Sequence, residues 1–124
     1  MNKPIKTNYD LEERLVAFSI RIIDIINEMH DTKAAKHLSG QLIRSGTSVS
    51  LNYGEAQSGE SRKDFIHKMK IVLKELRETY VCLTIIYRSA LIEKGTLIED
   101  TLKENDELIA IFVKSIGTAE KNAG

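Results

Sequence analysis

The sequence predicts an all-α protein: an elongated, antiparallel, up-and-down four-helix bundle that forms a single domain over residues 1–124. Three observations favour this fold. The only proline, Pro4, stands near the N-terminus, so the rest of the chain is free to run as long helices. Apolar residues recur three and four positions apart, which is the period of a helix with one buried face. Hydrophobic residues make up 42% and charged residues 29% of the chain, as in ordinary folded domains.

The first predicted helix spans residues 10–29. Its main apolar series alternates at spacings of four and three residues and consists of Leu11, Leu15, Phe18, Ile22, Ile25 and Met29. This spacing places all six side chains on one face. Three further isoleucines, Ile20, Ile23 and Ile26, widen the apolar surface beyond what one packing partner needs. They indicate a second buried contact, for example with another subunit.

The second predicted helix, residues 34–56, is rich in small residues. Gly40, Gly46 and Gly54 each cost about 1 kcal/mol relative to alanine in a helix interior. Small residues at helical spacing let another backbone come close, so we expect a tight helix crossing here. The alternative interpretation is that these small side chains leave space on the surface for a ligand.

The third predicted helix spans residues 61–93. Ser61 followed by Asp64 resembles a capping box, with aspartate in place of the usual glutamate or glutamine. Two apolar stripes run along this segment, so we expect burial on two sides. The single cysteine, Cys82, lies in an apolar stretch, and we interpret it as a buried packing residue.

The fourth predicted helix spans residues 98–116. Gly95 is expected to end the helix before it, and Gly117 to stop the fourth helix itself. Residues 118–124 offer little to bury, so we expect a flexible C-terminal tail. Short connections between the four helices favour antiparallel neighbours.

The densest polar constellation lies on the second and third predicted helices. It consists of Arg44, Ser48, Asn52 and Glu55 on one side of the second helix and of Glu75 and Glu78 on one face of the third. In an antiparallel pair, an arginine of one helix can meet a glutamate of the other. We interpret these residues as a polar core or subunit-interface network, which most often specifies register or oligomer geometry. No nucleophile or metal-ligand set accompanies them, so we predict no catalytic residue, metal site or cofactor.

Charge is unevenly distributed although the formal net charge is zero. The net charge is −2 over residues 1–31, +5 over residues 32–90 and −3 over residues 91–124. Candidate phosphate contacts on the third predicted helix are Arg62, Lys63, Lys68, Lys70, Lys74 and Arg77. The basic segment either faces an anionic partner or pairs with acidic helices of its own bundle or of a neighbouring subunit.

An enzymatic alternative starts from Arg62 and His67. Their Arg-x4-His spacing resembles the motif of HEPN ribonucleases, in which histidine moves a proton and arginine steadies the phosphate. The motif falls in the first turns of a helix, where both residues also suit an exposed helix start. It remains an alternative to a non-enzymatic role.

The location of the protein follows from what the sequence lacks. No apolar run approaches the ~20 residues needed to cross a bilayer, and the N-terminus lacks the apolar centre of a signal peptide. We therefore expect a cytoplasmic protein without a membrane partner.

A larger group of residues resembles a known family. It comprises Gln41, Leu42, Ile43, Arg44 and Ser45, then Ser48, Asn52, Tyr53, Glu55 and Ala56, then Ser61, Lys63, Asp64 and Phe65, and finally Lys74, Glu75, Leu76, Glu78 and Thr79. This pattern resembles the bacterial four helix bundle protein family, whose members are encoded within intervening sequences of 23S ribosomal RNA genes or elsewhere in bacterial chromosomes. The resemblance extends from Leu11 to about Ile116. Gly46 and Leu76 depart from it, because the family more often has alanine at both positions.

The resemblance implies an antiparallel four-helix bundle that assembles as a homopentamer. Such a pentameric bundle is similar to the accessory variability protein of diversity-generating retroelements, which binds nucleic acid and a reverse transcriptase. It implies no established catalytic activity. We therefore expect a non-enzymatic homo-oligomer, with no evident small-molecule substrate, that binds RNA or DNA through the basic side of the second and third helices. A pure protein-protein scaffold and a ribonuclease using Arg62 and His67 are the alternatives.

Overall fold

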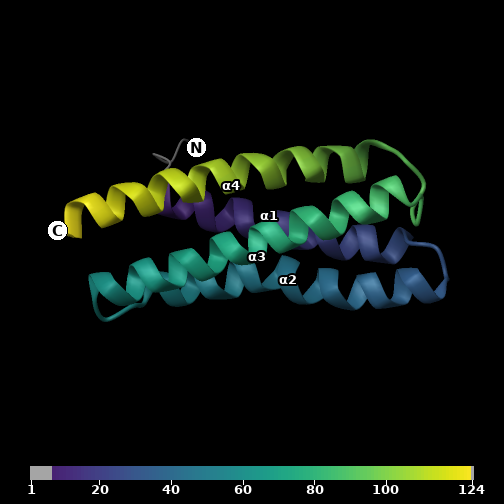
Figure 1. The fold of residues 1–124 in the computed structure, drawn as a ribbon. Coiled ribbons are helices and arrows are strands. Elements are labelled where there is room, and N and C mark those ends of the chain that lie inside the picture. The colour runs from purple at the N-terminus through teal and green to yellow at the C-terminus, as the bar shows by residue number, and fades with distance from the viewer. Residues whose placement is uncertain (1–6, 124) are drawn as a thin grey trace, which may run out of the picture.

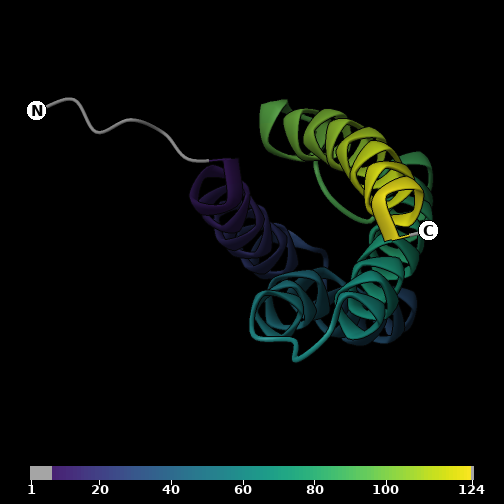
Figure 2. The same ribbon diagram turned by 90° about the vertical axis from the view of Figure 1, so that its left-hand side faces the viewer.

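The computed structural model describes residues 7–123, and the side chains of residues 10–122; Pro4 lies outside this range. These residues form four helices: α1 (Thr7–Glu28), α2 (Lys33–Gln57), α3 (Arg62–Arg88) and α4 (Thr96–Ala123). Consecutive helices run in opposite directions along an elongated body (Figure 1). Each helix packs against its neighbours in sequence, and α4 also packs against α1, so the four form a ring seen from one end (Figure 2). The predicted all-α four-helix bundle is confirmed.

The apolar series predicted from the sequence form the core. Leu11, Leu15, Phe18, Ile22 and Ile25 of α1 are all buried, as their spacing requires. A T-shaped aromatic pair joins α2 to α4, with the ring centroids of Tyr53 and Phe112 5.9 Å apart. The four helices therefore share one continuous packed core, and the surface sites described below lie on the outside of it.

The predicted tight crossing of the glycine-rich helix occurs at Gly46. The Ser19 hydroxyl of α1 donates a hydrogen bond of 2.8 Å to the Gly46 carbonyl oxygen and lies 2.7 Å from the Ser50 hydroxyl. A Cβ added at Gly40 or Gly54 would meet no atom within 4 Å. The prediction is confirmed for Gly46 and wrong for the other two glycines, which face open space.

The third helix ends earlier than its apolar pattern predicts. Ser61 caps its start, because its hydroxyl accepts a hydrogen bond of 3.1 Å from the Asp64 N–H. The helix stops at Arg88, and Ala90 adopts the left-handed backbone conformation with φ of 54°. Ile92, which follows this turn, is 2% exposed. The predicted end at residue 93 is wrong, because the chain turns to bury Ile92 rather than continuing along the helix axis.

The fourth helix runs from Thr96 through Gly117 to Ala123, so the predicted stop at Gly117 and the flexible tail are both wrong. Ala119 is only 8% exposed. The Lys70 ammonium group of α3 lies 2.8 Å from a carboxylate oxygen of Glu120. These contacts with the bundle offset the cost of about 1 kcal/mol that a glycine imposes inside a helix.

Candidate functional site

An arginine of α2 joins two carboxylates of α3. Arg44 Nη1 lies 3.2 Å from Glu75 Oε1, and Arg44 Nη2 lies 3.2 Å from Glu78 Oε2. The two glutamates stand three residues apart and so share one face of α3. The side chain of Glu75 is 12% exposed and that of Arg44 is 50% exposed. The cluster therefore ties α2 to α3 at the boundary between the core and the solvent.

The two carboxyl groups differ in acidity because their surroundings differ. Burial raises the pKa of Glu75, the neighbouring Glu78 raises it further, and Arg44 opposes both effects. Interaction with Glu75 and then with Arg44 lowers the pKa of Glu78. Hydrogen bonding to Glu78 and the charge of Glu75 raise the pKa of Arg44, so the guanidinium stays charged. Glu78 is thus the more readily ionised partner.

The other residues of the predicted polar network do not join this cluster. The Ser48 hydroxyl donates to the Arg44 carbonyl oxygen at 2.6 Å, and the Asn52 amide donates to the Ser48 carbonyl oxygen at 3.0 Å, both within α2. Glu55 forms an ion pair with Lys68 of α3. The six residues are therefore divided among one interhelical cluster, two bonds to the backbone of their own helix and a separate ion pair.

Sequence reasoning also missed other contacts between helices, of which two are described here. The Thr79 hydroxyl of α3 donates a buried hydrogen bond of 2.9 Å to the Ser45 hydroxyl of α2. The sequence did contain a signal for this hydrogen bond, because Ser45 directly follows Arg44 and Thr79 directly follows Glu78. On the opposite side of the bundle, Arg14 of α1 binds both carboxylate oxygens of Glu104. A separation of 90 residues leaves no local pattern that reveals this second pair.

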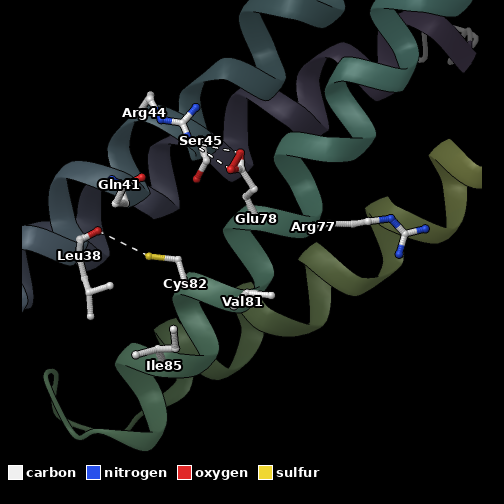
Figure 3. Close-up of a pocket in the computed structure, with 9 residues that line it drawn as sticks. All are labelled: Leu38, Gln41, Arg44, Ser45, Arg77, Glu78, Val81, Cys82 and Ile85. Carbon is white, nitrogen blue, oxygen red and sulfur yellow. Dashed lines mark hydrogen bonds and ion pairs between the residues drawn. The ribbon is translucent and has the colours of Figure 1, made fainter.

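A surface groove of about 440 Å³ runs between α2 and α3 (Figure 3). It is lined by Leu38, Gln41, Arg44 and Ser45 of α2 and by Arg77, Glu78, Val81, Cys82 and Ile85 of α3. The Cys82 thiol donates to the Leu38 carbonyl oxygen at 3.6 Å, and burial raises the pKa of that thiol. Cys82 is therefore a buried packing residue, as predicted. The groove offers an apolar floor beside the Arg44 cluster.

The predicted basic residues of α3 fall into two groups. Lys68 pairs with Glu55 and Lys70 with Glu120, so their charges are offset within the chain. The others are exposed and have no ion-pair partner among the residues described: Arg62, Lys63, Lys74 and Arg77. We call these four residues the free basic set. Arg62 and Lys63 also line a second groove of about 440 Å³ near the start of α3.

The pair proposed for a ribonuclease does not share one face. Both Arg62 and His67 are exposed on α3. They are five residues apart, which separates their directions by about 140° around the helix axis. A phosphate held by Arg62 would therefore not lie directly over His67.

The part of the chain that the structure describes contains neither a candidate membrane span nor a metal-ligand cluster. No helix there has an apolar stretch long enough to span a membrane. No cluster of three or more His, Cys, Asp or Glu side chains within the described ranges is arranged to hold a metal ion.

The family model described as 23S rRNA-intervening sequence protein matches residues 8–114. The chain belongs to this family. Its predicted membership is therefore confirmed, and the matched segment includes the Arg44 cluster, the free basic set and most of α4.

A solved structure supports the same relationship. It is a protein of unknown function from the S23 ribosomal protein family of Bacteroides thetaiotaomicron VPI-5482, with a TM-score of 0.78 and 29% sequence identity. The match covers 86% of this chain and 97% of that one. No curated protein matches the chain. The family is thus established, together with its bundle fold.

Proposed function

We propose that this family member is a non-enzymatic, homo-oligomeric bundle that binds RNA in the cytoplasm through the outer side of α3. The observation that carries the proposal is the free basic set, Arg62, Lys63, Lys74 and Arg77, on one helix of a chain whose net charge is zero. Cations without internal partners are available to neutralise phosphates, and the release of counterions then favours binding.

The distribution of ion pairs supports a partner outside the chain. Among the described side chains, three ion pairs tie α3 to α2, through Glu75, Glu78 and Lys68, and a fourth ties it to α4, through Lys70. The free basic set remains exposed although acidic residues outside these pairs are present on α1 and α4. An anionic ligand is therefore the partner that the charges of this face favour.

The absence of a catalytic role is part of the proposal. Arg62 and His67 point in different directions around α3, and the Arg44 cluster has its polar groups engaged with one another. The bundle is proposed to bind RNA without cutting it. The same measurement also covers DNA, whose phosphates would contact the same basic residues.

The test combines light scattering after size exclusion with binding of a labelled structured RNA at two salt concentrations. We expect an oligomer whose affinity for RNA falls steeply as salt rises. The double variant K63E/K74E should weaken binding by about tenfold or more at low salt. K103E/K114E is the matched control, because it makes the same charge change at exposed lysines of α4.

Other outcomes identify the alternatives. RNA binding that neither salt nor K63E/K74E alters would overturn the proposed interface. An oligomer that does not bind RNA or DNA would be a protein-protein scaffold. RNA cleavage that His67→Ala abolishes, with the helical content unchanged, would show a ribonuclease instead.

A further inference from the structure

Two apolar faces of the bundle have no partner within the described chain. On α1, Val16, Ile20 and Ile23 are 42%, 52% and 41% exposed. Their i, i+4, i+7 spacing is that of a helix that inserts one side into a groove. On α3, Val81 and Ile85 are 57% and 44% exposed at the edge of the α2–α3 groove (Figure 3). We call the first set the α1 stripe and the second the α3 stripe.

The two stripes cannot cover each other within one chain. The helices α1 and α3 occupy opposite corners of the four-helix ring, with α2 and α4 between them (Figure 2). Both stripes are exposed and so lie on the outside of this ring. A contact between them requires two copies of the chain.

Charges of opposite sign flank the two stripes at the same separation. Glu13 and Asp24 flank the α1 stripe and stand eleven residues apart; Arg77 and Arg88 flank the α3 stripe and also stand eleven residues apart. Eleven residues correspond to about 16 Å along a helix and about three full turns. All four side chains are exposed, and none forms an ion pair within the part of the chain that the structure describes.

The positions around each helix define how the charges would meet. At 100° per residue, the two acidic residues lie about 60° to one side of the α1 stripe, and the two arginines lie about 50° to the opposite side of the α3 stripe. When two helices pack in parallel, as in a parallel coiled coil, residues on one side of the first stripe face residues on the opposite side of the second stripe. Helices α1 and α3 run in the same direction in one chain (Figure 1). Copies related by rotation about an axis along the bundle keep that parallel direction.

We infer that the α1 stripe of one copy docks against the α3 stripe and the α2–α3 groove of a second copy. In this contact Glu13 faces Arg77, and Asp24 faces Arg88. The two surfaces differ, so the contact is heterologous, and its repetition closes a ring when the rotation allows. The inference rests on the proposed self-association and names the surfaces that produce it. Arg77 is the member of the free basic set that this contact would neutralise, so the RNA test above uses Lys63 and Lys74 instead.

Charge reversal followed by its restoration tests the pairing. The double variants E13R/D24R and R77E/R88E each place like charges across the proposed contact, so we expect both to lose the oligomeric mass in light scattering. The quadruple variant E13R/D24R/R77E/R88E restores opposite charges and keeps the net charge of the natural chain. We expect it to regain the oligomeric mass. K103E/K114E on α4 serves as the control and should assemble normally.

Three results would overturn the inference. Double variants that keep the natural oligomeric mass would show that these charges are not in the contact. A quadruple variant that is folded by circular dichroism but stays monomeric would show that the two charge pairs do not face each other. A natural chain that is monomeric would remove the contact altogether, and RNA binding by that monomer would leave the proposed ligand intact.

A substitution in the α1 stripe gives an independent measurement. Ile20→Glu places a charge in the centre of the proposed contact, at a position that is half-exposed in one copy. We expect a folded monomer with unchanged helical content. Ala110→Glu is the matched control, because Ala110 is exposed on α4, outside both surfaces of the proposed contact. Equal oligomeric masses for the two variants would contradict the proposed contact.

Discussion

Gly46 of α2 lies so close to Ile22 of α1 that a Cβ added to Gly46 would be 2.8 Å from Cγ1 and 2.9 Å from Cγ2 of Ile22. Real Cβ atoms essentially never approach other atoms to within 3.0 Å. Ile22 is fully buried, so it has little room to move. The glycine at this position therefore sets how closely α1 and α2 approach.

Gly46→Ala should destabilise the bundle although alanine favours helices. Overpacking against Ile22 costs about 1–3 kcal/mol, and the gain in helix propensity returns about 1 kcal/mol. We therefore expect a net loss of up to about 2 kcal/mol in the free energy of unfolding, measured with urea. Gly40→Ala is the control, because Gly40 faces open space and should gain about 1 kcal/mol. Equal gains at both positions would mean that Ile22 yields without cost.

Glu75→Gln should change how stability depends on pH. Burial raises the pKa of Glu75 above its ordinary value of 4.5, so the folded state retains a proton that the unfolded state releases. The stability contributed by Glu75 is therefore fully present below about pH 4.5 and is lost as pH rises through its folded pKa. We expect the Glu75→Gln variant to gain stability relative to the natural chain as pH rises from 4.5 toward neutrality, in urea unfolding at each pH.

Glu78→Gln provides the opposite case. The pKa of Glu78 is lowered in the folded state, so its stabilisation is present above pH 4.5 and is lost as pH falls through the folded pKa. We expect the natural chain to gain stability relative to this variant as pH rises through the folded pKa of Glu78 toward 4.5, below the range that tests Glu75. The same direction of change in both variants would contradict the assignment of the two environments.

The end of α4 should contribute to stability. Ala119→Asp places a charge at a buried position in the last turns of that helix and should lower the free energy of unfolding by about 1–3 kcal/mol. Ala110→Asp, on the exposed side of α4, carries the same loss of helix propensity without the burial. Equal urea midpoints for the two variants would show that the turn containing Ala119 is not packed in solution.

The salt dependence of RNA binding should report individual phosphate contacts. Replacing Lys63 or Lys74 by alanine removes one cation from the free basic set, so the slope of log affinity against log salt should decrease in size by about 0.7–0.9. Lys68→Ala is the comparison, because Lys68 already pairs with Glu55. We expect its slope to match that of the natural chain. A slope that changes only for Lys68→Ala would move the interface to the α2 side of α3.

The sequence predicted the helices better than it predicted their ends. The periodic apolar residues of α1 identified its buried face, because helical periodicity is a local property. The ends of α3 and α4 depend on distant contacts instead. Ile92 is buried only because the chain turns at Ala90, and Gly117 stays helical because the residues after it contact the bundle.

The candidate site was predicted only in part, because local spacing indicates some of its contacts and distant residues decide the others. Arg44, Glu75 and Glu78 were predicted to meet because their spacing places them on facing sides of two antiparallel helices. The partners of Lys68 and Lys70 were not predicted, and they divide the basic residues into paired and free ones. No local pattern indicates which lysine of a solvated helix will find a carboxylate on a neighbouring helix.

The sequence by itself determined the all-α class, the buried face of α1, the start of α3 at Ser61 and the family. These properties depend on residue spacing and residue type along one segment. Only the tertiary structure decided where α3 and α4 end, which glycine permits a close crossing and which basic side chains remain free. Each of these depends on atoms that are distant in sequence, and their positions are defined only once the four helices have packed together.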